Sequence, residues 1–148
     1  MASAIERLNA IRNGVGAAPP IYKLLDISVV EAKEGEVSLQ LRPHDGLRNP
    51  IGLVSGGAIA TLLDTALAWA CDTCVPSDKV STTIELKVNF LRPVSVNGGT
   101  VVATARVIHP GHRILVATAD LRQMDRDGAQ ARNCAVATAT CMIIPATG

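Results

Sequence analysis

The most apolar run of the chain lies between Asn49 and Ala70, and its pattern changes partway along. Turn residues open the run, and then apolar side chains recur at the i, i+3, i+4, i+7 spacing of one helix face. Ser55 stands just before the periodic part and is a favourable N-cap residue. The apolar positions are Ile59, Leu62, Leu63, Ala66, Leu67 and Ala70. The pattern therefore predicts a helix from about Ser55 to about Asp72 with one buried face.

Segments with the two-residue period of β-strands lie on both sides of this helix. Upstream, residues 21–32 and 36–43 flank the letters KEGE and predict a hairpin. Downstream, residues 82–91 alternate, with Thr82, Ile84, Leu86, Val88 and Phe90 on one side and Thr83, Glu85, Lys87 and Asn89 on the other. Three more β-branched segments are separated by the turn signals PGH and DRDG; they cover residues 99–109, 113–124 and 131–144. We expect a meander of long antiparallel strands.

The start of the chain has a separate helical pattern. Apolar residues within 3–13 have helical spacing, Gly14 ends the pattern, and the letters GAAPP indicate a linker. We therefore predict an N-terminal helix and linker over residues 1–21 and a single domain over 22–148. One sheet packed around one helix is an α+β architecture.

Composition excludes several classes of function. The 148 residues carry a formal net charge of +1 and only 2% aromatic residues, which argues against nucleic-acid binding. No apolar run is long enough for a membrane span and no targeting segment is visible, so we expect a cytoplasmic protein with reduced cysteines. Cys71 and Cys74 form a CxxC pair without a second pair at zinc-site spacing. We predict no metal and no cofactor.

Asp64 is the unusual residue of the central helix, because a charge in apolar surroundings is costly unless it is paired or solvated. On a helical wheel, Asp64 falls outside the apolar stripe and shares a face with Gly57, Ala60, Ala68 and Cys71. These small side chains allow another element to approach closely. We expect a second copy of the chain to lie there.

Gly56 and Gly57 occupy the first turn of the same helix. Its free N–H groups and positive dipole end can stabilise a developing oxyanion, and glycine lets a ligand come close. Gly56 and Asp64 are eight residues apart, roughly 12 Å at about 1.5 Å per residue, so one carbonyl cannot touch both. Antiparallel helices in a homodimer would bring Gly56 of one chain near Asp64 of the other, giving two sites per dimer.

The combination of Asn49, Gly52, Ser55-Gly56-Gly57 and Asp64 resembles hotdog-fold acyl-CoA thioesterases of the phenylacetate-pathway, 4-hydroxybenzoyl-CoA thioesterase-like type. The resemblance covers about residues 22–144 and includes the letters STTIELKVNFLRPV and ARVIHPGHRILVATADLR. It implies a sheet wrapped around one central helix, assembled into dimers and often tetramers. It also implies hydrolysis of an acyl-CoA thioester at the dimer interface.

The resemblance assigns roles to individual residues. It implies that Asp64 is the general base or nucleophile, that the Gly56 N–H binds the thioester oxygen and that the Asn49 amide helps to hold it. Thr83 would orient the attacking water, and Gly57 would let the acyl chain pass. Arg92, Arg113 and Lys87 are candidates for binding the CoA phosphates, since arginine suits phosphate geometry; solvated strand-end charges are the alternative.

One residue departs from the family pattern, and simpler roles exist for the others. The family usually has His where this chain has Ser55, and a serine cannot act as a cation or proton shuttle near neutral pH. Ser55 could contact substrate or serve only as the N-cap, Asn49 could be only a turn residue, and Thr83 could be an exposed strand residue. Two other functions are open: an acyl-CoA-binding or sensing module with a degenerate site, and a hotdog hydratase or dehydratase.

Overall fold

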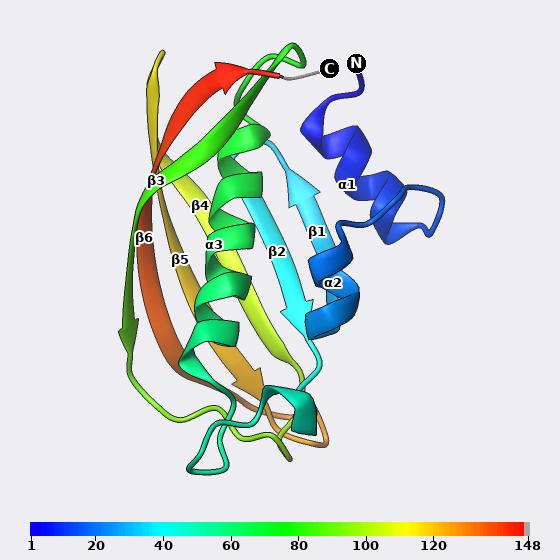
Figure 1. Cartoon of the computed structure of the whole chain (residues 1–148), viewed down its shortest axis with the longest axis vertical. Helices are drawn as coiled ribbons and strands as arrows, with labels where there is room; N and C mark the ends of the chain where they lie inside the picture. Colours follow the sequence, from blue (N-terminus) through cyan, green and yellow to red (C-terminus); the bar gives the residue numbers. More distant parts are fainter. Residues whose placement is uncertain (147–148) are drawn as a thin grey trace.

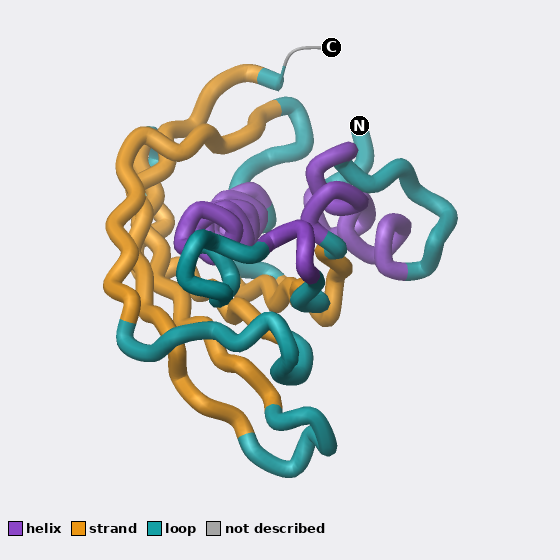
Figure 2. The backbone as a smooth tube through the Cα atoms, turned by 60° about the horizontal axis from the view of Figure 1, so that its bottom comes forward, coloured by secondary structure: helices purple, strands orange, loops and turns teal. Residues whose placement is uncertain are grey.

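The computed structural model describes residues 1–146 and consists of one antiparallel sheet that curls around a long helix (Figures 1 and 2). The helices are α1 (Ala4–Arg12), α2 (Pro20–Leu25) and α3 (Gly56–Asp72), with a 3-10 turn, η1, at Asp45–Leu47. The strands are β1 (Ile27–Lys33), β2 (Glu36–Leu41), β3 (Lys79–Phe90), β4 (Val101–Pro110), β5 (Ile114–Met124) and β6 (Ala131–Pro145). The α+β prediction is confirmed. The last two residues of the predicted domain, 147–148, lie outside the described residues.

The central helix forms as its pattern predicts. It begins after Ser55, whose hydroxyl oxygen accepts a hydrogen bond from the Gly57 N–H, and it ends at Asp72. Leu62, Leu63 and Leu67 are fully buried against the sheet. The facing strand positions are often alanine (Ala103, Ala105, Ala117 and Ala139), so the helix can lie close to the sheet. Each buried leucine contributes on the order of 2 kcal/mol of transfer free energy.

The strand order is β1-β2-β4-β5-β6-β3. The predicted hairpin is present as β1 and β2, and the meander is present as β4, β5 and β6. The expectation that residues 82–91 precede the other strands in one meander is wrong, because β3 pairs with β6 at the far edge. Residue periodicity reports which face of a strand is buried, not which strand is its neighbour.

The segment after the linker was assigned wrongly in its first half. Pro20–Leu25 is helical and the strand begins only at Ile27, whereas the pattern predicted a strand from residue 21. Proline at the first helical position is favourable, and Asp26 closes the helix in the left-handed conformation with φ 56°. Six residues are too few for helical periodicity to show. Tyr22 of this helix is buried and accepts a hydrogen bond from the Trp69 indole at 2.8 Å.

The N-terminal helix α1 packs on β1. Ser3 and Glu6 form a capping box at its start, and the fully buried Leu8 joins the main core. The Arg12 guanidinium donates to the Val30 carbonyl at 3.3 Å on this strand. The proposed division into residues 1–21 and 22–148 stays a prediction. No helix within residues 1–146 is long and apolar enough to span a membrane.

A bulge in β3 corrects the predicted faces of that strand. Thr83 pairs with Cys141 and Glu85 with Thr140, so Ile84 is the extra residue. The alternation holds for Leu86 and Val88, which are half-buried toward the helix. Upstream of the bulge the faces are exchanged: Ser81 and Thr83 reach α3, whereas Thr82 and Ile84 are exposed.

Candidate active site

The Asp64 carboxylate and the Thr83 hydroxyl form the first part of the candidate site. Asp64 is half-buried on α3, and the Thr83 hydroxyl donates a hydrogen bond to Asp64 Oδ1 at 2.8 Å. Thr83 is directed at the helix only because of the bulge at Ile84. Within residues 1–146, no other side chain hydrogen-bonds to Asp64. The second carboxylate oxygen can therefore accept a proton from water or a bond from a ligand.

The N-terminal end of α3 forms the second part of the site. The Gly57 N–H is capped by Ser55, whereas the Gly56 N–H has no acceptor within residues 1–146. The Phe90 ring lies over Gly56: a Cβ built there would be 3.2 Å from the ring. A Cβ at Gly57 would meet only the Ser55 hydroxyl, at 3.6 Å. Gly56 thus offers a free donor in a confined position at the positive end of the helix.

Asn49 lies beside this helix end. Its Oδ1 accepts hydrogen bonds from the N–H groups of Ile51 and Leu53 at 3.1 and 3.0 Å, as an Asx turn does. Gly52 completes the turn with a positive φ of 85°. The Asn49 amide NH₂ has no acceptor within residues 1–146. The turn and a ligand-binding role are therefore compatible, since each uses a different end of the amide.

A hollow of about 320 Å³ joins Asn49 and Gly56. Its other walls are aliphatic except for Phe90 and Arg92. The exposed Arg92 side chain donates to the Asn133 carbonyl at 2.9 Å, so its guanidinium is held at the rim. The hollow combines hydrogen-bond donors with an apolar wall, which is typical of a site for an apolar group attached to a polar head.

The remaining predicted residues lie elsewhere. Arg113 is exposed in the turn before β5, next to the end of the sheet that carries Thr83. It lies roughly 26 Å along the sheet from the row of Phe90, at about 3.3 Å per residue. Lys87 is exposed on the face of the sheet opposite α3, where it lines a hollow with Thr104 and Thr118. Within one chain, therefore, no common site is lined by Arg92, Arg113 and Lys87.

The small-residue face predicted for α3 is present over most of its length. Gly57 is exposed, and Ala60, Asp64 and Ala68 are half-buried. Cys71 is an exception, because it is fully buried in the core. A hydrogen bond to Cys141, together with burial, raises the pKa of the Cys71 thiol. Cys141 in turn lies 3.9 Å from the Thr83 hydroxyl, directly behind the Asp64 pair.

A second carboxylate–hydroxyl pair joins α3 to β3, and it was not predicted from the sequence. Asp72, the last residue of the helix, accepts hydrogen bonds from the Ser81 N–H at 2.6 Å and the Ser81 hydroxyl at 2.8 Å. Burial is the largest influence on Asp72 and raises the pKa of its carboxyl. The available signal was the spacing, since Asp72 lies eight residues after Asp64 and Ser81 two residues before Thr83.

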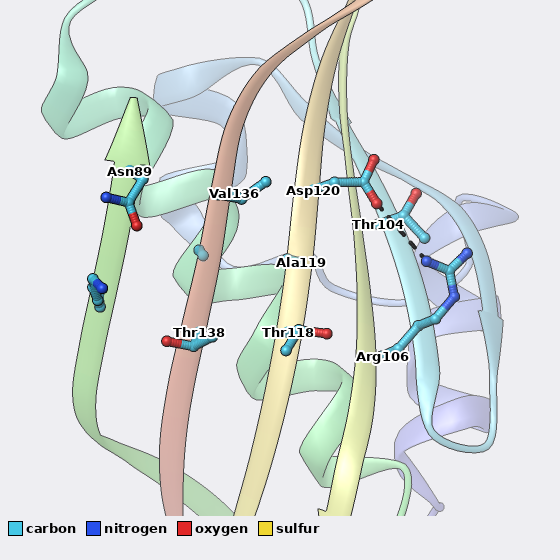
Figure 3. A pocket seen from close by; sticks show the side chains of 10 residues that line it. Asn89, Thr104, Arg106, Thr118, Ala119, Asp120, Val136 and Thr138 are labelled. Carbon is cyan, nitrogen blue, oxygen red and sulfur yellow. Dashed lines mark ion pairs between the residues drawn. The ribbon is translucent and has the colours of Figure 1, made fainter. Parts of the chain in front are cut away.

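A separate hollow of about 330 Å³ lies on the outer face of the sheet (Figure 3). Threonine side chains from β4, β5 and β6 line it together with Arg106 and Asp120, which lie 3.8 Å apart as an ion pair. Arg106 also pairs with Glu36 at 2.9 Å. These charges compensate one another, and α3 lies on the opposite side of the sheet. The face carries no catalytic arrangement comparable to that of Asp64.

Comparison with known proteins identifies similar sequences. The sequence profile of the thioesterase superfamily matches residues 51–129. Human acyl-coenzyme A thioesterase 13 is 25% identical over 122 residues, which cover 82% of this chain and 86% of that protein. A relative from Halobacterium salinarum is 35% identical over 102 residues, about two thirds of each chain (66% and 66%).

Solved structures show the same architecture. A thioesterase family protein from Silicibacter pomeroyi superposes with a TM-score of 0.82 at 29% identity, covering 94% of this chain and 99% of that one. A phenylacetic acid degradation-related protein from Ralstonia eutropha superposes with a TM-score of 0.77 at 25% identity, covering 92% and 98%.

Proposed function

The chain belongs to the thioesterase superfamily and has its hotdog fold, as the motif resemblance predicted, and we propose that it hydrolyses an acyl-CoA or aryl-CoA thioester to a free acid and CoA. The observation that carries the proposal is the Thr83–Asp64 hydrogen bond of 2.8 Å, two helical turns from a free helix N-terminus. Similarity to acyl-coenzyme A thioesterase 13 supports the choice of substrate.

In this mechanism Asp64 removes a proton from water, which attacks the thioester carbonyl; direct attack by the carboxylate is the alternative route. Thr83 holds one carboxylate oxygen and leaves the other for the water. The Gly56 N–H, assisted by the Asn49 amide, stabilises the oxyanion of the tetrahedral intermediate. The C–S bond then breaks, the CoA thiolate takes up a proton, and the carboxylic acid leaves.

The site needs two protomers, and β3 suggests how they pair. The outer edge of this 12-residue strand has no partner within residues 1–146, whereas β1 at the other edge is tied to α1. Antiparallel pairing of two β3 strands about a two-fold axis at Lys87 would set Phe90 opposite the bulge formed by the partner's Thr83 and the partner's Ile84. Because Phe90 covers Gly56 and Thr83 bonds to Asp64, this register would join the two half-sites.

The same pairing gives roles to the other residues. Gly57 and Ala60 would lie against the partner helix, and Gly57 would leave room for the acyl chain. Arg92, at the rim of the hollow, would contact the CoA phosphates. Arg113 would reach them only from the partner protomer. Ser55 would cap the helix, with a direct contact to substrate as the alternative role, and a tetramer would form from two such dimers. We place the protein in the cytoplasm, where its four cysteines stay reduced.

The alternatives predict different outcomes with a panel of acyl and aryl CoA esters followed by release of free thiol. A binding module would bind the esters without turnover. A hydratase would interconvert enoyl and 3-hydroxyacyl esters, and its site requires a histidine beside the acid. Within residues 1–146, Asp64 has no histidine partner. We therefore expect hydrolysis of at least one ester in the panel.

Complementation between two inactive variants tests the shared site. Asp64→Asn removes the base and Gly56→Ala crowds the oxyanion position, so each homodimer should be inactive. After unfolding and refolding of an equal mixture, half of the dimers are mixed and each has one intact site. Activity should return to about a quarter of the wild-type value. Thr83→Val is the matched control: it changes the same half-site as Asp64→Asn, so a mixture of these two variants gains no intact site and should be no more active than the diluted Thr83→Val protein. A mixture of Asp64→Asn and Gly56→Ala that stays inactive contradicts the shared site.

A further inference from the structure

Asp72 occupies an unfavourable position for a carboxylate. It is the last residue of α3, where the helix dipole opposes a negative charge. Burial is the main reason that its pKa is raised, and the nearby charge of Arg7 offsets this only in part. A carboxylate held in such a place requires hydrogen bonds that offset these costs.

Those contacts all come from one residue of β3. The N–H and hydroxyl of Ser81 both donate to the same Asp72 oxygen, at 2.6 and 2.8 Å. The Ser81 hydroxyl also lies 3.3 Å from the Ala68 carbonyl oxygen, one turn earlier on the helix. These hydrogen bonds attach both the backbone and the side chain of Ser81 to the end of α3, two residues before Thr83.

The Ser81–Asp72 hydrogen bonds matter because a different register of β3 would bury more apolar surface. In the observed register the bulge leaves Ile84 outside, 53% exposed, and turns the polar Ser81 and Thr83 inward. An unbulged strand that keeps Leu86 and Val88 against the helix would place Thr82 and Ile84 inward instead. A one-residue shift reverses every upstream side chain, and burial of Ile84 favours that shift.

We propose that Asp72 and Ser81 are positioning residues that hold β3 in the bulged register, and so present the Thr83 hydroxyl to Asp64. Neither residue needs to touch substrate. The catalytic consequence rests on the proposed function, whereas the register itself does not.

Kinetics test the catalytic consequence. Asp72→Ala should lower kcat about tenfold to hundredfold, similar to Thr83→Val, with KM within about threefold. Asp72→Asn should restore kcat, because the amide oxygen still accepts both bonds from Ser81. The double variant Asp72→Ala/Thr83→Val should be no slower than Thr83→Val alone, since both changes remove one interaction. Losses that multiply, or full kcat in a folded Asp72→Ala variant, would overturn the proposal.

Thiol reactivity tests the register without any enzymatic activity. In a Cys74→Ser background, which removes the half-buried native cysteine, Thr82→Cys places a thiol at an exposed position and keeps Ile84. It should react rapidly with an aromatic disulfide reagent, and addition of Asp72→Ala should slow the reaction at least about tenfold as position 82 turns inward with Ile84. Asp72→Asn should leave it fast. An unchanged rate in the alanine variant would refute the register change, even if no thioester proves to be a substrate.

Two controls distinguish a change in the register of β3 from a general loss of folding. Circular dichroism and dimer mass should be the same for Asp72→Ala and Asp72→Asn. Replacing Ile84 by Thr in the Asp72→Ala background removes the apolar drive for the shift and should recover at least about threefold of the lost kcat. No recovery in this folded double variant would count against competition between registers.

Discussion

Two aspartates of α3, Asp64 and Asp72, each meet a hydroxyl group of β3, yet they lie in different surroundings. Asp72 receives two hydrogen bonds from Ser81 on one oxygen, at the closed end of the helix. Asp64 receives one, from Thr83, and lies on the half-buried small-residue face. The residue types and their spacing are nearly the same. Each aspartate keeps one oxygen without a hydrogen bond from residues 1–146, so the reactive carboxylate is distinguished by the surface it faces.

The same substitution at both positions gives the most direct test of this difference between Asp64 and Asp72. Asp64→Asn should lower kcat for a hydrolysed acyl-CoA by about a thousandfold, because an amide cannot accept the proton of water. Asp72→Asn should change kcat less than about threefold. Initial rates of CoA thiol release measure both. Equal losses in the two variants would mean that both aspartates serve the same purpose.

The two hydroxyl partners provide the next test. Thr83→Val has nearly the same shape without the hydroxyl and should lower kcat about tenfold to hundredfold, whereas Thr83→Ser should retain it within about threefold. Loss of a hydrogen bond to the carboxylate explains the difference. Dimer mass by light scattering is the control for assembly. A valine variant as fast as the serine variant would remove Thr83 from the catalytic pair.

Ser55 tests whether a hydroxyl in the motif can be purely structural, as we propose for Ser81. Ser55→Ala should lower the free energy of unfolding by about 1 kcal/mol through loss of the Gly57 cap, at 3.3 Å, while kcat changes less than about threefold. Urea unfolding and steady-state rates measure the two effects. Ser55→Asp, which keeps a capping acceptor, is the matched stability control. A large loss of kcat at unchanged stability would instead assign Ser55 to substrate binding.

The smallest expected effect is the pH dependence of stability at Asp72. Its pKa is raised in the folded protein, so its contribution to stability is complete below the unfolded pKa and is lost as pH rises through the folded pKa. Asp72→Asn removes this loss and relieves the charge at the helix end. It should be about 0.5 kcal/mol more stable than wild type at neutral pH, and the gap should close in acid. Chemical unfolding at several pH values checks this; a constant gap contradicts it.

Much of the architecture could be predicted because it depends on local pattern. The central helix, its Ser55 cap and the β1–β2 hairpin follow from residues within one or two turns of each other. The short α2 helix could not be found in this way, because six residues contain too little periodicity. The position of β3 beside β6 could not be predicted either, since hydrogen bonding between distant strands leaves no periodic signal in the sequence.

The residues of the candidate site were likewise predictable only where they depend on local pattern. Asp64, Gly56 and Asn49 could be selected from spacing on one helix and one turn. The path by which Thr83 reaches Asp64 could not, because perfect alternation in residues 82–91 placed it on the opposite face. The bulge at Ile84 breaks that alternation, and nothing in the local letters marks it. Asp72 was missed because its role depends on a strand that arrives from across the fold.

The sequence by itself determined the helix, the strand segments, and the separation of the oxyanion donor from the acid, since these follow from residue spacing and helix geometry. The folded structure was needed to show which face of β3 meets α3, which edge of the sheet stays open, and which aspartate lies on the small-residue face. Those outcomes depend on contacts between segments far apart in the chain, where burial of apolar side chains competes with the hydrogen bonds that Asp64 and Asp72 accept from β3. The complete tertiary packing decides the outcome of this competition, and residues adjacent in the sequence do not.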